Sequence, residues 1–392
     1  MAAVRLLFTV LLLVWGMSSS FNELHADDGQ PIAIRNWGNG GTTIETQWGF
    51  ILGLGPGVDD SSEMPLDFNL SSLKPNESVL LSRAPNQAEI TVSRVENSRE
   101  IVELDKLKAN QVFAVRGKQK EPMSVFVDGV VLLLFSEVPD KEHFESQKAV
   151  DKVAKTLSQR PIAIKVIKDE MSAEDCQKIA AAYQPILMIV PRSTKKVGDV
   201  EVEMVSHNTV AFSTSKNEDS KPKFVSLGDK AYEMSAELKE LFARKEAACR
   251  ASQEFFAKLS VEQMNFKPNN GTHTPRWNPE HMMGRELLFF SQIYNAVDPM
   301  IPVMDLNPKQ MPKDYQFAHP DWTGAEEARQ MQRVAAFTRR FAYLLDKMDL
   351  NRRAKGSRFW SPRELLKQME RHYSEHTENT KKKMELPSWP ER

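Results

Sequence analysis

The spacing of hydrophobic and polar positions divides the chain into two halves. From about residue 31 to about residue 228, apolar and polar residues alternate as in half-buried strands, with Gly, Pro, Asn and Asp between the runs. From Met234 onward, apolar residues recur every three or four positions, which is typical of amphipathic helices. The pattern predicts a multidomain α+β protein, with a strand-rich mixed α/β domain at residues 31–228 and a helical domain at residues 234–385.

The first half carries two more specific signals. Asp128 and Gly129 lie between the apolar runs SVFV and VVLLLF, and an Asp-Gly pair in that setting favours a tight hairpin. Further along, a helical stretch at residues 143–157 is followed by the strand IAIKVI, a helix opened by Ser172, and the strand ILMIVP. This alternation predicts an α/β layer beside a largely antiparallel β region.

Four helices are expected in the second half. The second begins at Asn278 and Pro279, a favourable cap followed by a favourable first-turn residue. The third and fourth open on segments with the spacing of capping boxes, Thr323 with Glu326 and Ser361 with Glu364. Four amphipathic helices bury their stripes most simply as a four-helix bundle, for which we expect an up-and-down order.

Two histidines lie on the apolar stripe of the predicted fourth helix. Leu365, Met369, His372 and His376 follow one another at spacings of four, three and four residues, so they share one face. A buried imidazole must be hydrogen-bonded, protonated or ligated, because an unpaired buried polar group is costly. His281, in the first turn of the second helix, can add a nitrogen from a facing helix. These three histidines therefore form a candidate metal site, and a hydrogen-bonded core network is the alternative.

Other polar residues near these histidines have simpler interpretations. His273 and His319 fall in loops that could cover the site, and loop capping explains both. Glu375 is a base candidate by its closeness to His376, although helical spacing turns it toward solvent. A basic cluster around Trp360 is explained by a solvated loop, with an anionic substrate as the other option: Arg352, Arg353, Lys355, Arg358 and Arg363.

A histidine early in the second of four helices, followed by an H-x-x-x-H pair on the fourth, resembles the DinB-like (DinB/YfiT) superfamily over about residues 234–385. That superfamily includes metal-dependent hydrolases and thiol-dependent transferases. The resemblance implies that His281, His372 and His376 bind one divalent cation, zinc or nickel most often, and that an unknown small molecule is the substrate. The catalytic residues stay unknown. The first half resembles a metallo-β-lactamase-like fold without its H-x-H-x-D-H motif, which implies a binding or scaffolding role.

The N-terminal residues predict where the protein is located. Arg5 precedes an apolar run from Leu6 to Met17, which is the pattern of a signal peptide, with Ala26 as its last residue or Ser20 as the alternative. The run is shorter than the roughly 20 residues of a membrane span. We therefore expect export to the periplasm or the medium, with no stable membrane anchor after cleavage.

The charge balance argues against a nucleic-acid-binding protein, and the cysteine content argues against a disulfide-rich one. The 52 basic residues balance 53 acidic ones, so the chain has no global field that would draw it to nucleic acid. Two cysteines, Cys176 and Cys249, are too few for a disulfide framework. Buried packing is the expected role of both, although pairing stays open, as does a homodimer.

Overall fold

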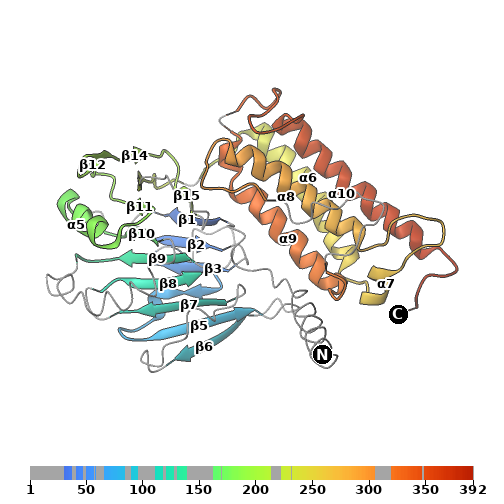
Figure 1. Ribbon diagram of the computed structural model, residues 1–392, viewed down its shortest axis with the longest axis horizontal. Helices are drawn as coiled ribbons and strands as arrows, with labels where there is room; N and C mark the ends of the chain where they lie inside the picture. The colour runs from blue at the N-terminus through green and yellow to red at the C-terminus, as the bar shows by residue number, and fades with distance from the viewer. Residues whose placement is uncertain are drawn as a thin grey trace, which may run out of the picture.

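The computed structural model describes most of both halves of the chain. The described residues are 31–37, 41–46, 50–56, 58, 66–83, 90–95, 111–117, 121–127, 130–138, 162–168, 170–212, 222–230, 232–304, 319–346 and 348–391. The predicted signal peptide and the helical stretch expected at residues 143–157 lie outside them. Strands occupy the first half and helices dominate the second, so the predicted α+β class is confirmed (Figure 1).

Two sheets form the first half. The smaller has the order β15-β1-β2-β3-β4, with these strands at Thr209–Phe212, Ile32–Asn36, Thr42–Glu45, Ile51–Leu54 and Phe68–Asn69. The larger has the order β14-β16-β11-β10-β9-β8-β7-β5-β6, at Glu203–Met204, Lys223–Ser226, Leu187–Ile189, Ile162–Val166, Val130–Phe135, Met123–Val127, Gln111–Arg116, Ser78–Arg83 and Ile90–Val95. A short ribbon, β12 (Lys196–Val197) with β13 (Val200–Glu201), and a 3-10 turn, η2 (Leu70–Ser72), complete this half.

The larger sheet changes from antiparallel to parallel at β9. Strands β8 and β9 pair antiparallel with Val127 opposite Val130, which confirms the predicted hairpin, although its two turn residues lie outside the described ones. β10 then pairs parallel with both β9 and β11, and helix α5 (Ala173–Tyr183) connects β10 to β11. The Ser172 side chain accepts a hydrogen bond from Asp175 N, so the predicted cap is also confirmed.

Aliphatic side chains from both sheets meet in one core, in which Ile34 and Leu52 of the smaller sheet pack with Val125 and Leu132 of the larger. The sheets therefore form a sandwich. Helix α5 covers the other face of the larger sheet and buries Cys176 there. Cys249 is buried in the helical half, and both cysteines are free thiols, as their packing role requires.

The second half contains α6 (Ala236–Phe256), α7 (Val261–Asn265), α8 (Trp277–Asn295), α9 (Gly324–Arg340), the 3-10 turn η4 (Ala342–Leu344) and α10 (Pro362–Met384). Thr323 accepts from Glu326 N and Ser361 from Glu364 N, so both predicted helix starts are confirmed. In the described part of the chain, none of these helices has the length and hydropathy needed to cross a bilayer.

Helix α8 begins earlier than predicted. Its first residue is Trp277, so Asn278 lies inside the helix and the prediction of Asn278 as the cap is wrong. The Asn278 side chain is buried and donates to Thr274 O at 2.9 Å. Asn and Asp side chains readily form hydrogen bonds to nearby backbone groups. This bond therefore gives the buried amide nitrogen of Asn278 a partner inside the helix.

Neighbouring helices run in directions that differ from the up-and-down expectation. Arg276, at the start of α8, pairs with Glu327 near the start of α9, and Tyr294, near the end of α8, donates to Thr338 O near the end of α9. These two helices are therefore parallel. Helix α6 and helix α10 are also parallel, since Glu237 pairs with Arg363 at their starts.

The pair α6 and α10 runs opposite to the pair α8 and α9. Asn278 near the start of α8 contacts His376 in the later part of α10, whereas Glu286 contacts Tyr373 one turn earlier. The order is thus up, down, down, up, and the predicted up-and-down succession is wrong. The connection at residues 296–323 is long enough to return along α8, whose 19 residues span about 28 Å.

The two halves contact each other through the smaller sheet. Arg340 donates to Glu45 at 2.9 Å, and Arg35 pairs with the same carboxylate at 3.0 Å. Burial alone would raise the pKa of Glu45, but the guanidinium groups of Arg340 and then Arg35 lower it overall. Ala33 and Ala211 also belong to the helical core, so apolar packing accompanies this charged contact.

Candidate metal centre

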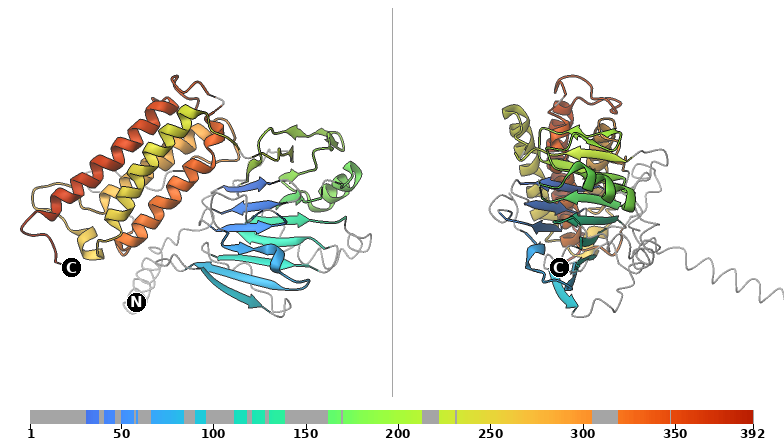
Figure 2. Two further views of the ribbon diagram at one scale, coloured as in Figure 1. Left: turned by 180° about the vertical axis from the view of Figure 1, so that it is seen from behind. Right: turned by 90° about the vertical axis from the view of Figure 1, so that its left-hand side faces the viewer.

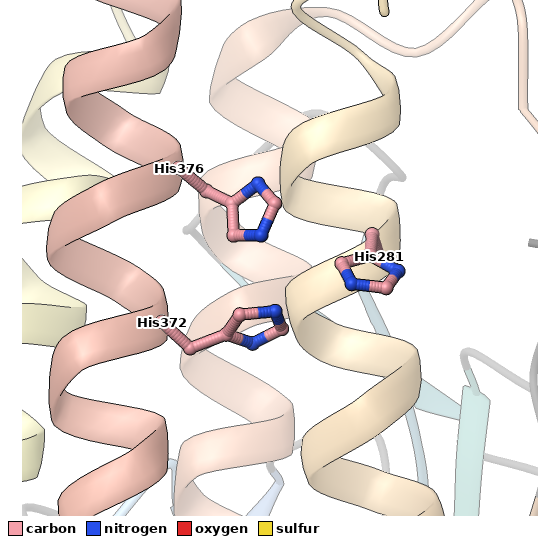
Figure 3. A group of neighbouring side chains, drawn as sticks. All are labelled: His281, His372 and His376. Atoms are coloured by element: carbon pink, nitrogen blue, oxygen red, sulfur yellow. The ribbon is translucent and has the colours of Figure 1, made fainter. Parts of the chain in front are cut away.

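Three imidazole rings meet between α8 and α10 (Figure 3). The ring centroid of His281, on α8, lies 4.9 Å from that of His372 and 5.1 Å from that of His376, both on α10. The centroids of His372 and His376 are 4.5 Å apart. One nitrogen atom from each ring lies within 4.8 Å of the others, so the fold brings together the three residues predicted as ligands.

The placement of these rings follows from helical periodicity. Leu365 and Met369 are fully buried in the helical core, and His372 continues the same face of α10 with 8% of its surface exposed. His376 comes one turn later and is partly buried. Because α8 is antiparallel to α10, the first turns of α8 face this part of α10, which places His281 opposite the pair.

Asn278 fixes the orientation of one ring. Its amide nitrogen donates to Thr274 O at 2.9 Å, which leaves Oδ1 to act as the acceptor for His376 Nδ1 at 2.8 Å. His376 therefore carries its proton on Nδ1, and its Nε2 keeps a free lone pair. This is the arrangement that orients a metal-binding histidine. Asn278 stands three residues before His281, and that spacing was the signal available in the sequence for its role.

One ring nitrogen of His372, Nδ1, is buried without a hydrogen-bond partner among the described residues. Burial, followed by the charges of His376 and His281, lowers the pKa of His372 to about 3. Burial and the charge of Lys383 lower the pKa of His376 to about 4. Both rings are therefore neutral at pH 7, which is the state that binds a cation.

An indole ring forms one wall of the site. Trp277 stacks on His281 with centroids 4.4 Å apart and planes 11° apart. On its other side it stacks on His273 at 3.8 Å and 12°. Trp277 is 6% exposed, so the three rings form a packed column beside the site. His273 thus lies in the wall and is absent from the group of potential ligand atoms.

The nearby carboxylates point elsewhere. Glu375 is exposed and pairs with Arg371 at 3.7 Å, which agrees with its predicted solvent-facing position. Glu280 accepts from His319 N at 3.1 Å, and His319 stacks on Trp322 at 3.5 Å. Among the described residues, the group of potential ligands contains only histidines. The centre therefore offers a cation one nitrogen from each of three imidazole rings.

A buried ion pair next to the histidines escaped prediction. Lys245 on α6 pairs with Glu286 on α8, and both side chains are fully buried. Tyr373, the residue after His372, donates its hydroxyl to Glu286 Oε2 at 2.6 Å, and Thr338 donates to Oε1 at 2.7 Å. One carboxylate thus connects α6, α8, α9 and α10 in the layer adjoining the site.

Three comparisons with known proteins were negative. No family model, no curated protein and no solved structure matches this chain.

Proposed function

We propose that the protein binds one divalent metal ion through His281, His372 and His376, and that it is an exported hydrolase or transferase acting on a small molecule. One observation carries the metal assignment: a buried nitrogen of His372, without a hydrogen-bond partner among the described residues, lies in a group of three imidazoles whose ligand atoms are within 4.8 Å. Such a nitrogen is costly to bury unless a cation occupies the space between the rings.

The chemistry of the donors favours a borderline transition metal. Three imidazoles suit zinc or nickel, and three protein ligands leave a coordination position open, as in catalytic zinc sites. When bound, the metal would supply Lewis acidity that lowers the pKa of a water or thiol in that position. Since Glu375 faces solvent, no neighbouring carboxylate is assigned as a general base.

The surrounding residues hold the donors in place. Asn278 keeps the His376 ring in the tautomer with Nε2 unprotonated, and Trp277 packs along the His281 ring. The four long helices α6, α8, α9 and α10 contribute to one apolar core, which supports a four-helix bundle of the DinB-like kind.

A second candidate function deserves a test because of one contact. The hydrogen bond between Asn278 and His376 is what a core polar network would also contain. In that case the protein would be a binding or structural module without turnover, and metal would be irrelevant to its folded state.

Thermal unfolding with and without zinc distinguishes the two functions. Zinc at one hundred times its dissociation constant should stabilise the parent protein by about 2.7 kcal/mol and raise its unfolding midpoint, and a chelator should reverse the shift. The His372→Ala variant should show no shift. Parent midpoints that are identical with zinc, nickel and chelator would favour the structural module.

Replacing Asn278 by leucine should weaken metal binding without removing a ligand. Loss of the acceptor frees the His376 ring to rotate or change tautomer, and changes of this kind typically cost 10- to 100-fold in affinity. Competition with a chromogenic chelator measures the dissociation constant. The matched control is Glu375→Gln, which changes an exposed neighbour of His376 and should leave the constant unchanged. Equal constants for the parent and Asn278→Leu would show that Asn278 does not position the ring.

A further inference from the structure

The loop before α10 contains two adjacent aromatic residues, of which Trp360 packs inward and Phe359 is exposed. Trp360 packs near Phe289 with ring centroids 6.2 Å apart and borders the helical core. Phe359 is 68% exposed, the largest value among the exposed large hydrophobic side chains of the described residues. Single exposed apolar side chains are common on protein surfaces, so the surroundings of Phe359 decide whether it has a role.

The exposure of Phe359 is imposed by a well-bonded loop. Ala354 N donates to Trp360 O at 2.9 Å, and Trp360 N donates to Ser357 Oγ at 2.8 Å. Gly356 has φ +85, and a Cβ atom there would lie 2.2 Å from Gln292 O on α8. The loop is thus seated directly on the end of α8, so Phe359 cannot turn inward without breaking these contacts.

Positive charge surrounds this phenylalanine. Arg353, Lys355 and Arg358 are exposed, and none forms an ion pair with an acidic side chain in the part of the chain that the structure describes. The Arg358 guanidinium carbon lies 4.9 Å from the Phe359 ring centroid. The other two cations of the basic cluster are compensated, Arg352 by Asp349 at 3.3 Å and Arg363 by Glu237. The loop therefore presents three uncompensated cations around one exposed apolar ring.

The position of the loop allows a flat surface to reach it. In Figure 1 and in both views of Figure 2, the connection between α9 and α10 stands out at the upper end of the helical half, the same end at which Arg340 and Tyr343 contact the first half. The candidate metal centre lies farther along α10, so contact at this end leaves the histidines uncovered.

We propose that this loop docks the protein on a bilayer surface rich in anionic lipid. Phe359 enters the boundary between headgroups and acyl chains, while Arg353, Lys355 and Arg358 lie among the lipid phosphates. Each cation held near such a surface strengthens binding about fivefold, so three contribute about 100-fold. The contact is peripheral, since a single aromatic ring and a few charges give reversible binding.

A bilayer fits the loop better than a nucleic acid does. The whole chain has a net charge of −1, so long-range attraction is weak toward a nucleic acid and toward an anionic bilayer alike, and the contacts of the loop itself decide between them. An apolar ring gains most where it leaves water for an apolar medium, which the bilayer provides. A nucleic-acid surface normally combines a basic groove with several stacking rings, whereas this loop exposes one.

Vesicle sedimentation tests the proposal. The full chain, and the same chain beginning at residue 27 so that the apolar N-terminal run cannot contribute, are mixed with vesicles of pure phosphatidylcholine or of phosphatidylcholine with 40% phosphatidylglycerol. Both proteins should bind only the anionic vesicles appreciably. The Phe359→Ser variant should bind at least tenfold more weakly, and the triple variant Arg353→Gln, Lys355→Gln, Arg358→Gln about 100-fold more weakly.

A matched control distinguishes the effect of the loop cations on vesicle binding from the effect of the protein's total charge. The variant Lys178→Gln, Lys195→Gln, Lys196→Gln removes three exposed cations from the first half and should bind like the parent. Unchanged far-UV circular dichroism verifies that all variants fold. The proposal is overturned if the parent does not prefer anionic vesicles, if the two loop variants bind like the parent, or if single-stranded DNA is bound more tightly than the vesicles.

Discussion

Replacing Glu286 by glutamine is expected to lower the free energy of unfolding by about 3–5 kcal/mol, which is the usual effect of removing one partner of a buried ion pair. Lys245 would keep its charge in a position with 0% side-chain exposure and no carboxylate beside it. The loss arises mainly from that uncompensated charge, because the single amide oxygen of glutamine can still accept one of the two hydrogen bonds that Tyr373 and Thr338 donate to the separate oxygens of Glu286. Urea unfolding followed by circular dichroism measures the change.

The double variant Lys245→Met, Glu286→Gln is the control for this interpretation. It removes both charges and keeps the hydrogen-bond acceptor, so its unfolding free energy should lie closer to the parent than that of the single variant. A single variant as stable as the parent, or a double variant with the two losses simply added, would contradict a coupled buried pair. Because Tyr373 adjoins His372, the single variant should also loosen the packing of α10 beside the histidines.

Acid should destabilise the metal-free protein through its buried histidines. The folded-state pKa of His372, about 3, lies below the ordinary histidine value of 6.5 because of burial and the charges of His376, His281, Arg285 and Arg371. Below pH 6.5 the unfolded chain takes up a proton that the folded chain refuses, so stability falls from pH 6.5 down to about pH 3. At pH 5 the contribution of His372 alone is about 2 kcal/mol.

The His372→Leu variant isolates that contribution. In the presence of a chelator, the parent should lose about 2 kcal/mol more than the variant between pH 7 and pH 5, since leucine does not titrate. Urea unfolding at the two pH values gives the difference. Parallel losses in the parent and the variant would mean that the fold does not keep His372 neutral.

Local signals in the sequence were sufficient for three helix starts and for the helix face that carries two of the histidines. Ser172, Thr323 and Ser361 each cap the helix that they were predicted to open, because capping depends on residues a few positions apart. His372 and His376 could be placed on the buried face of α10 because helical periodicity is equally local. The first half was recognisable as strand-rich for the same reason.

Features that depend on tertiary packing were not predictable. The direction of α9 relative to α8 depends on the path of residues 296–323, and their length allowed either direction. Asn278 is a residue type that often caps helices, but it lies one residue inside α8. Its hydrogen-bond partner there is a histidine 98 positions away in the sequence. Lys245 and Glu286 each interrupt an apolar stripe, and only the fold shows that the two interruptions meet.

Metal content measured by mass spectrometry tests the three-histidine site most directly. The chain beginning at residue 27 is purified, incubated with zinc and nickel, and freed of loosely bound ions, alongside the variant His281→Ala, His372→Ala, His376→Ala. The parent should retain about one equivalent of one of the two metals and the variant none, because three imidazole donors are the proposed ligands. Equal metal in both proteins, or none in either, would contradict the site.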